Sequence, residues 1–138
     1  MKTTIRTVLL AALLLAPLAH AGDLTLRVDK VQAGTGAIMV SVYDNAGGYL
    51  KRPARVAQVP ATPGATTVVI PDLAPGDYAI TVYHDVNGNG QLERNLFGIP
   101  LEPYAFGNDA QGEMGPPAFE AAKVNVPAAG RAATVTLR

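Results

Sequence analysis

The sequence predicts an all-β fold, an antiparallel Greek-key sandwich of about seven short strands. Several segments alternate apolar and polar residues with a period of two, which gives a strand one buried face and one solvated face. The 138 residues include 14 glycines and 11 prolines, and both residue types disfavour long helices. Short strands separated by turn residues favour two packed sheets.

The first strand is expected at residues 24 to 29, where leucines and a valine alternate with polar residues. A more continuously apolar run at 37 to 43 is expected to lie in the middle of a sheet. Gly34 and Gly36 lie between these runs and favour a turn. The two strands are therefore predicted to pair as a hairpin.

Four more strands are expected later in the chain. Residues 66 to 70 are rich in β-branched side chains, and residues 78 to 85 alternate in polarity. The segment 71 to 77 between them holds two prolines and a glycine, so it is predicted to turn rather than continue a ladder. The last two strands are expected at 123 to 126 and 132 to 137.

Residues 44 to 64 form a stretch that is too long for an ordinary turn. A short helix is expected within it, around residues 45 to 50. The stretch as a whole is interpreted as a crossover between the two sheets. The alternative is a small anion-attracting patch formed by Lys51, Arg52 and Arg55, if the fold brings these side chains together.

Residues 86 to 121 form a still longer segment without a predicted strand. Loops of more than about 12–15 residues in a compact domain are usually functional or disordered. Disorder is disfavoured, because disordered segments are poor in aromatic residues. This segment contains Phe97, Tyr104, Phe106 and Phe119. One long ordered loop is therefore predicted, with its aromatic side chains folded back over one face or edge of a sheet.

The first 21 residues predict a cleaved signal peptide. Lys2 and Arg6 precede an apolar run at 8 to 18, and residues 19 to 21, Ala-His-Ala, have the pattern that signal peptidase recognises. The apolar run is too short for a membrane-spanning helix, which needs about 20 residues. Cleavage leaves one domain at 22 to 138, exported to the periplasm or secreted, with no membrane span. The alternative is an uncleaved N-terminal anchor.

Composition and charge exclude several classes of protein. Without cysteine the chain cannot form a disulfide scaffold, a thiolate metal site or a cysteine nucleophile. Removal of Lys2 and Arg6 leaves nine basic against eleven acidic residues. A nucleic-acid partner is therefore not expected, because nucleic-acid binders normally have a basic face.

One stretch of the chain has recognisable ligand chemistry. Oxygen-bearing side chains at alternate positions precede Gly90, which fits the first half of a calcium loop of the D-x-N-x-N-G kind. The predicted metal ligands are Asp85, Asn87, Asn89, Gln91 and Glu93. Leu96 stands where a complete loop has a glutamate, so the predicted calcium affinity is weak. The alternative is that asparagine and glycine only build a tight turn after the strand.

Catalysis is not predicted. His84 is the one histidine after residue 21, and with Asp85 it could serve acid–base chemistry. Ser41, the one serine, lies in the middle of a predicted strand without a glycine elbow. A zinc site would need further histidine or cysteine ligands. The alternative to a non-catalytic protein is a hydrolase-like enzyme centred on His84 and Asp85.

Four stretches in and around the predicted loops form a distinctive combination. They are Y-D-N-A-G-G-Y-L at 43 to 50, L-A-P-G-D-Y-A-I-T-V-Y-H-D-V-N-G-N-G at 73 to 90, N-L-F-G-I-P-L-E-P-Y-A-F-G-N at 95 to 108 and G-P-P-A-F-E-A-A at 115 to 122. Together they resemble the DUF2141 family of uncharacterised bacterial proteins. The resemblance implies an exported, prealbumin-like β-sandwich with no established activity.

The chain departs from the pattern of that family in two of these stretches. The family usually reads D-E-N-G-N-G-K-L-D, whereas Val86 and Glu93 stand at the acidic positions here. It also reads Y-G-F-S-N, whereas Ala105 and Gly107 replace the glycine and the serine. The resemblance therefore leaves calcium binding open.

The predicted function is a non-catalytic binding or accessory module of the cell envelope. The partner would be an envelope protein, a glycan or a small ligand held by the long loop. The candidate groove has Tyr104 and Phe106 as apolar walls. The polar groups at its mouth are His84, Asp85, Glu102 and Asn108. The hydrolase alternative rests on analogy with transthyretin-like hydroxyisourate hydrolases, which rely on several histidines and a C-terminal tetrapeptide that this chain lacks.

Overall fold

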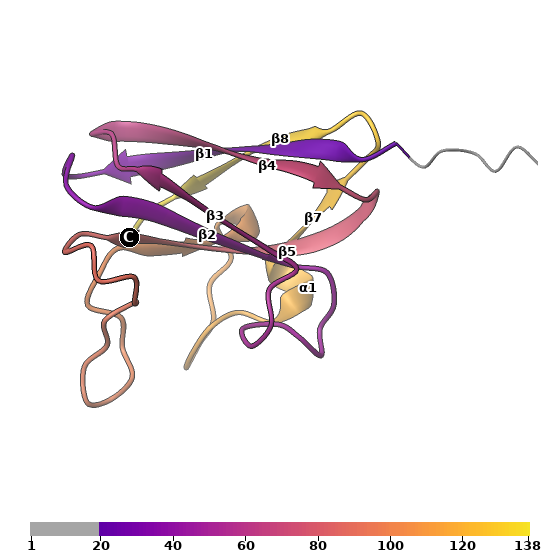
Figure 1. The fold of residues 1–138 in the computed structure, drawn as a ribbon. Coiled ribbons are helices and arrows are strands. Elements are labelled where there is room, and N and C mark those ends of the chain that lie inside the picture. The colour runs from indigo at the N-terminus through magenta and orange to yellow at the C-terminus, as the bar shows by residue number, and fades with distance from the viewer. Residues whose placement is uncertain (1–19) are drawn as a thin grey trace, which may run out of the picture.

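The computed structural model describes residues 20–138, which fold as two β-sheets packed face to face (Figure 1). One sheet has the strand order β4-β1-β8, and the other contains five strands. The prediction of an all-β sandwich is confirmed, with eight strands in place of about seven. The predicted signal peptide lies almost wholly outside the described residues. Between residues 20 and 138, no helix has the length and apolar character needed to cross a bilayer.

The three-stranded sheet contains one parallel pair. It consists of β1 (Gly22–Val31), β4 (Gly64–Leu73) and β8 (Arg131–Thr136). β1 pairs antiparallel with β4 and parallel with β8. The turn before β8 packs against the backbone of Gly22, so β8 starts beside the start of β1 and runs in the same direction. This pair is the one departure from antiparallel pairing among the described strands.

The five-stranded sheet is built around β5. Its members are β2 (Ala37–Tyr43), β3 (Arg55–Pro60), β5 (Gly76–Asp85), β6 (Tyr104–Phe106) and β7 (Lys123–Val126). β2 lies between β3 and β5, while β6 and β7 pair with successive parts of the other edge of β5. The chain therefore leaves the centre of this sheet when β5 ends at Asp85.

Alternating residues of the two sheets form the core between them. In β1 the side chains of Leu24, Leu26 and Val28 are fully buried, and Ile80 and Val82 of β5 belong to the same cluster. Burial of each such side chain contributes about 1.5–3 kcal/mol to stability. Within the described residues 20–138, all members of this cluster lie between positions 24 and 137, so the segment 22 to 138 contains them all.

The predicted hairpin between the first two strands is wrong. β1 and β2 belong to different sheets, and the segment 32–36 crosses between them. Gly36 has a φ of 71°, and a side chain there would collide with the backbone of Asp85. The glycine therefore serves a close approach between the crossover and the end of β5. Period-2 alternation locates a strand, but it does not identify the partner of that strand.

The interpretation of residues 44 to 64 as one crossover with a short helix is also wrong. Residues 44–54 join β2 to β3 within one sheet, and only 61–63 cross to β4. At the predicted helix, the Gly48 amide donates to Asn45 Oδ1 at 2.7 Å, as at a helix N-cap, but the chain forms only turns there. β3 was missed because it is an exposed edge strand with weak alternation.

β4 continues where the sequence predicted a turn. It extends through Pro71 to Leu73, and Leu73 pairs with Gly22 after a register shift. β4 is an edge strand, so a proline without an N–H group is tolerated on its unpaired side. The turn between β4 and β5 is therefore only two residues long, 74 and 75.

A second apolar cluster covers the outer face of the five-stranded sheet. Its members are Tyr43, Ala79 and Ala122, packed with Tyr49, Phe106, Ala110 and Phe119. They come from the strands, from loop 44–54 and from the short helix α1 (Phe119–Ala122). Because loops cover this face, Ala79 is buried on the outer side of β5, and Thr81 and Tyr83 are half-buried there.

Tyr49 is packed between two aromatic rings in this outer cluster. Its ring meets those of Tyr43 and Phe119 edge to face, with centroid distances of 5.4 Å and 5.9 Å. Its hydroxyl is buried and has no hydrogen-bond partner among residues 20–138. Burial, with a smaller contribution from Tyr43, raises the pKa of the Tyr49 hydroxyl to about 12.

We predict that Tyr49→Phe leaves the free energy of unfolding at pH 7 unchanged or raises it by up to about 1 kcal/mol, because it removes an unsatisfied buried hydroxyl. In the parent, stability should fall between about pH 10 and pH 12, because the unfolded tyrosine ionises first. The variant should lose that part of the pH dependence. Urea unfolding over this pH range measures both effects.

The matched control is Tyr78→Phe. The Tyr78 hydroxyl donates to the carbonyl of Ala74 at 2.7 Å, so its removal should cost about 1 kcal/mol. A comparable loss in Tyr49→Phe would contradict the account, because it would mean that the Tyr49 hydroxyl has a partner.

Candidate functional site

Two loops form an ordered surface on the outer side of the five-stranded sheet. Residues 86–118 leave β5, form a tight turn and a hairpin, pair with β5 again through β6 and pass through the short 3-10 helix η1 (Gly107–Asp109). In Figure 1 they project from the same side of the sheet as loop 44–54. We call the surface made by residues 44–54 and 86–118 the loop face.

The Asp85 carboxylate organises the turn that begins the long loop. Its Oδ1 accepts hydrogen bonds from the amides of Gly88 and Asn89 at 2.9 Å and 3.1 Å, and its Oδ2 accepts one from Gly90 at 2.7 Å. The side chain is 2% exposed. Gly88 and Gly90 have φ values of 73° and 76°, which favour glycine. Hydrogen bonds from three amides stabilise the buried carboxylate and fix the turn around it.

A second buried carboxylate, Glu102, joins the two ends of the same turn. Its Oε1 accepts a hydrogen bond from the Val86 amide at 2.9 Å, and its Oε2 accepts one from the Glu93 amide at 3.3 Å. Glu102 therefore connects the start of the turn, its end and the strand β6 that follows. Neither Asp85 nor Glu102 forms an ion pair in the described part of the chain.

The structure brings three of the predicted calcium ligands to one point. Glu93 Oε1 accepts hydrogen bonds from the side-chain amides of Asn87 and Asn89, at 2.6 Å and 2.9 Å. The Asn89 Oδ1 atom accepts a hydrogen bond from the Gln91 amide at 2.9 Å. Asp85 lies at the start of the same turn.

The side chains of the 85–93 turn offer only a few oxygen atoms that could bind a cation. Calcium takes six to eight oxygen ligands, from carboxylates, amides, carbonyls and water. If the side-chain amide of an asparagine rotates by half a turn, its oxygen and nitrogen exchange places, and the oxygen then points where the nitrogen pointed before. In residues 20–138, no three His, Cys, Asp or Glu side chains are grouped to hold a metal. A cation here would therefore need amide and carbonyl oxygens in addition to the carboxylates of Asp85 and Glu93.

The segment after the turn is a tight hairpin, and many of its backbone N–H and C=O groups form hydrogen bonds within the hairpin. Arg94 and Pro100 form an isolated antiparallel bridge, and the Asn95 amide donates to the Ile99 carbonyl at 2.9 Å. Asn95 Oδ1 accepts hydrogen bonds from the amides of Phe97 and Ile99, at 2.9 Å and 3.0 Å. The Arg94 guanidinium donates to the carbonyl of Gly98 at 3.0 Å.

The tip of this hairpin is apolar and exposed. Phe97 is 87% exposed, and Leu96 is fully exposed. The expectation that Phe97 folds back over a sheet is therefore wrong. The hydrogen bonds of Asn95 hold positions 97 and 99 in a turn that points the tip away from the sheet. Four of the nine exposed large apolar residues in 20–138 lie in this short stretch: Leu96, Phe97, Ile99 and Leu101.

The other loop aromatics lie against the protein. Phe119 packs in the outer cluster, and Tyr104 and Phe106 meet edge to face with centroids 5.9 Å apart. The guanidinium of Arg138 lies 5.3 Å from the centroid of the Tyr104 ring. Covering of the sheet by aromatic residues thus holds for these three but not for Phe97.

His84 lies on the opposite side of β5 from Asp85. Neighbouring strand residues point to opposite faces, and His84 shares the inner face with Val82. His84 is 1% exposed, and its Nε2 lies 2.8 Å from the Thr35 carbonyl. A carbonyl only accepts, so Nε2 carries the proton and Nδ1 is left buried without a partner. His84 and Asp85 therefore do not form a side-chain pair.

The other polar side chains of the predicted groove also form hydrogen bonds to different parts of the backbone. The carboxylates of Asp85 and Glu102 accept backbone amides, as described above. The Asn108 side-chain amide donates to the carbonyls of Ala121 and Lys123, at 3.1 Å and 2.7 Å. Tyr104 and Phe106 lie on the outer face, opposite Tyr83 and Thr81. Among the described residues, the six side chains of the predicted groove, His84 included, therefore do not converge on one point.

Sequence reasoning missed the two most distinctive features of this surface. Glu102 was placed at the mouth of a groove, whereas it joins the ends of a turn. The exposed hairpin was treated as part of an aromatic cover. An available signal was the tetrapeptide Asn-Leu-Phe-Gly at 95 to 98, because a type I β-turn favours asparagine at its first position and glycine at its fourth.

Comparison with known proteins yields one family. The model of the DUF2141 family, described as an uncharacterized protein conserved in bacteria, matches residues 26–134. No curated protein and no solved structure matches the chain. The prealbumin-like relationship stays a prediction.

We predict that Asp85→Ala lowers the free energy of unfolding by about 3 kcal/mol, because three amides lose a charged acceptor. The turn and the hairpin should loosen together. Limited proteolysis should therefore cut residues 94–119 faster than in the parent. Asp44→Ala, at an exposed aspartate outside the turn, is the control and should leave the rate unchanged. Equal cutting rates in the parent and Asp85→Ala would contradict the coupling.

Proposed function

The chain belongs to the DUF2141 family of uncharacterised bacterial proteins, and we propose that it is an exported, non-catalytic binding or accessory module of the cell envelope. Its binding element is the hairpin of residues 93–101 on the loop face. The observation that carries this proposal is a hairpin whose backbone forms hydrogen bonds within the hairpin while its apolar tip is exposed. Soluble proteins rarely expose contiguous apolar surface unless it binds something.

The arrangement of the hairpin supports a binding role over a folding role. Leu96 and Phe97 belong to neither apolar cluster of the described residues, so they contribute little to folding. The hairpin is nevertheless held rigidly, through Asn95 at its tip and through Glu102 at its base. Rigid presentation lowers the entropy lost on binding.

Two features support a non-catalytic role over the hydrolase alternative. His84 is buried in the core and lies across the sheet from Asp85. Acid–base catalysis needs a group within hydrogen-bond reach of the substrate, and a side chain with 1% exposure offers no such reach. Asp85 has a structural use in its three backbone hydrogen bonds.

Export to the periplasm or the exterior rests on the pattern of residues 1 to 21. The basic residues, the short apolar run and the Ala-His-Ala ending are typical of a cleaved signal peptide. The core cluster of the described residues lies after residue 21, so cleavage would leave that cluster intact.

Calcium binding at the 85–93 turn is the second part of the proposal. The ion would be held by oxygens of Asp85, Asn87, Asn89 and Glu93, with the backbone carbonyl of Gln91. The convergence of Asn87 and Asn89 on Glu93 supports this donor set. Calcium would stabilise the turn and thereby the hairpin that follows it.

We predict that calcium raises the thermal midpoint of the segment 22 to 138 relative to chelator, and that magnesium does not. A ligand that binds only the folded state adds about 2.7 kcal/mol of stability at a hundredfold excess over Kd. Glu93→Gln is the informative variant, because it keeps the size of the side chain and removes the central carboxylate. It should lose the calcium response with little change in chelator. The absence of a shift at millimolar calcium would contradict the calcium site.

We also predict that the double variant Leu96→Ser/Phe97→Ser changes the free energy of unfolding by less than about 0.5 kcal/mol, because both side chains are exposed. Urea unfolding measures this directly. The contrast is Val82→Ser, in the core, which should cost several kcal/mol. A large loss in the tip variant would show that the tip serves folding, and the binding proposal would then lose its basis.

A further inference from the structure

We propose that the hairpin tip inserts into the surface of a bilayer containing anionic phospholipid. This inference rests on the proposed binding role of the hairpin and names its partner. It concerns peripheral contact, in which a few side chains enter the boundary between headgroups and acyl chains.

The first argument is the state of the backbone at the tip. Burial of an unsatisfied N–H group in a lipid environment is costly. In the hairpin, the amides of Asn95, Phe97, Gly98, Ile99 and Leu101 donate to acceptors within residues 93–99, and Leu96 is the one residue of 95–99 whose amide does not. The tip can therefore lose contact with water without breaking these hydrogen bonds. An isolated apolar loop with free amides would lack this property.

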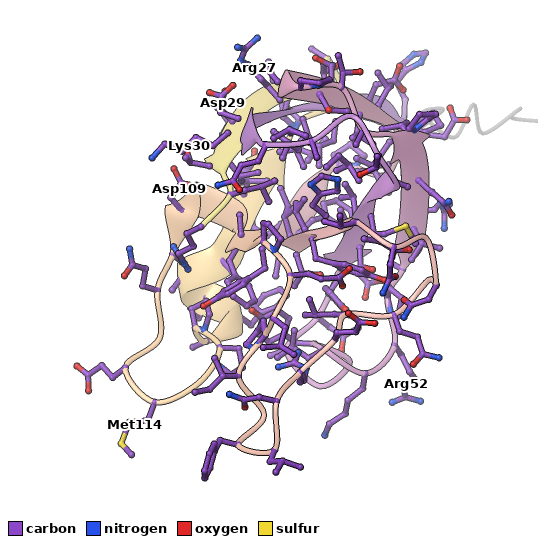
Figure 2. All side chains as sticks on the ribbon, turned by 90° about the vertical axis from the view of Figure 1, so that its left-hand side faces the viewer. Arg27, Asp29, Lys30, Arg52, Asp109 and Met114 are labelled. Atoms are coloured by element: carbon purple, nitrogen blue, oxygen red, sulfur yellow. The ribbon has the colours of Figure 1, made fainter. Side chains whose placement is uncertain are left out.

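The second argument is the placement of the apolar side chains. Leu96 and Phe97 project from the tip, and Ile99 and Leu101 are exposed beside them. The rest of the loop face exposes three large apolar residues, Leu50, Val86 and Met114. In Figure 2, the labelled Met114 and Arg52 both lie at the lower end of the molecule, away from Arg27 and Asp29 of β1. Several apolar side chains can therefore meet one surface.

The third argument is charge complementarity. Loop residues 49–54 and the hairpin stretch 94–101 contain Lys51, Arg52 and Arg94 and no acidic residue. In residues 20–138, none of these three cations forms an ion pair. Basic residues on the same side of the sheet as an apolar tip attract the phosphate groups of anionic lipids.

The acids of the long loop weaken this attraction little. Glu102 is buried, and Glu93 accepts hydrogen bonds from two asparagine side chains. Asp44, Asp109 and Glu113 are the exposed acids of the loop face. Asp109 accepts hydrogen bonds from Thr136 and lies away from Met114 and Arg52 in Figure 2. The contact is therefore assigned to the hairpin and to residues 49–54, with Met114 as an apolar addition.

A single tryptophan reports the insertion directly. The chain contains no tryptophan, so Phe97→Trp introduces the only indole. Its emission should shift to shorter wavelength on addition of phosphatidylglycerol vesicles, and brominated acyl chains should quench it. The matched control is Val69→Trp, on the exposed face of β4 in the three-stranded sheet. Its emission should not respond.

Vesicle co-sedimentation of the segment 22 to 138 then separates the contributions. The double variant Leu96→Ser/Phe97→Ser should bind phosphatidylglycerol vesicles at least about tenfold more weakly than the parent. Lys51→Gln/Arg52→Gln should bind more weakly and with a smaller dependence on salt. Binding of the parent to pure phosphatidylcholine vesicles should be weaker than to phosphatidylglycerol vesicles.

The outcomes distinguish this inference from the proposed function. If the tip variant is as stable as the parent and the parent does not bind either vesicle, the bilayer inference is overturned and the binding role of the hairpin stands. A concentration-dependent dimer that is lost in the tip variant, without vesicle binding, would identify a second copy of the chain as the partner and overturn the inference. Loss of folding in the tip variant would overturn both.

Discussion

The loop face depends on the Asp85 carboxylate, which accepts hydrogen bonds from three backbone amides at the point where β5 ends. Burial of a charged group is unfavourable unless hydrogen bonds compensate for lost hydration. Here the chain meets that requirement by curling around the carboxylate, and Glu102 repeats the arrangement one strand later. The turn is thus ordered by hydrogen bonds to two buried carboxylates and not by apolar packing. The hairpin projects from this turn.

The two faces of the five-stranded sheet have different physical roles. The inner face contributes Ile80 and Val82 to the core, and the outer face is covered by aromatic residues of the loops. Phe97 is released from this cover because Asn95 closes the hairpin before the chain returns to β6. The inner face of this sheet therefore stabilises the fold, and the loops on its outer side hold the exposed apolar hairpin tip.

Much of the fold was predictable from local pattern, whereas the pairing of strands was not. Alternation located β1 and β5, because one face of each is buried by the core. It missed β3, an exposed edge strand, and it could not reveal that β1 pairs with β4 and β8. In the candidate site, local spacing identified the 85–93 turn. The role of Glu102 depends on a contact between residues 16 positions apart in sequence, which no local pattern carries.

The most direct test of the central claim is amide hydrogen exchange of the segment 22 to 138, measured residue by residue in the parent and in Glu102→Gln. If buried carboxylates order the loop face, the amides of Val86, Gly88, Gly90 and Phe97 should be protected in the parent. They should lose protection together in the variant, while the amides of β1 keep theirs. Unprotected exchange of the loop amides in the parent would contradict the account.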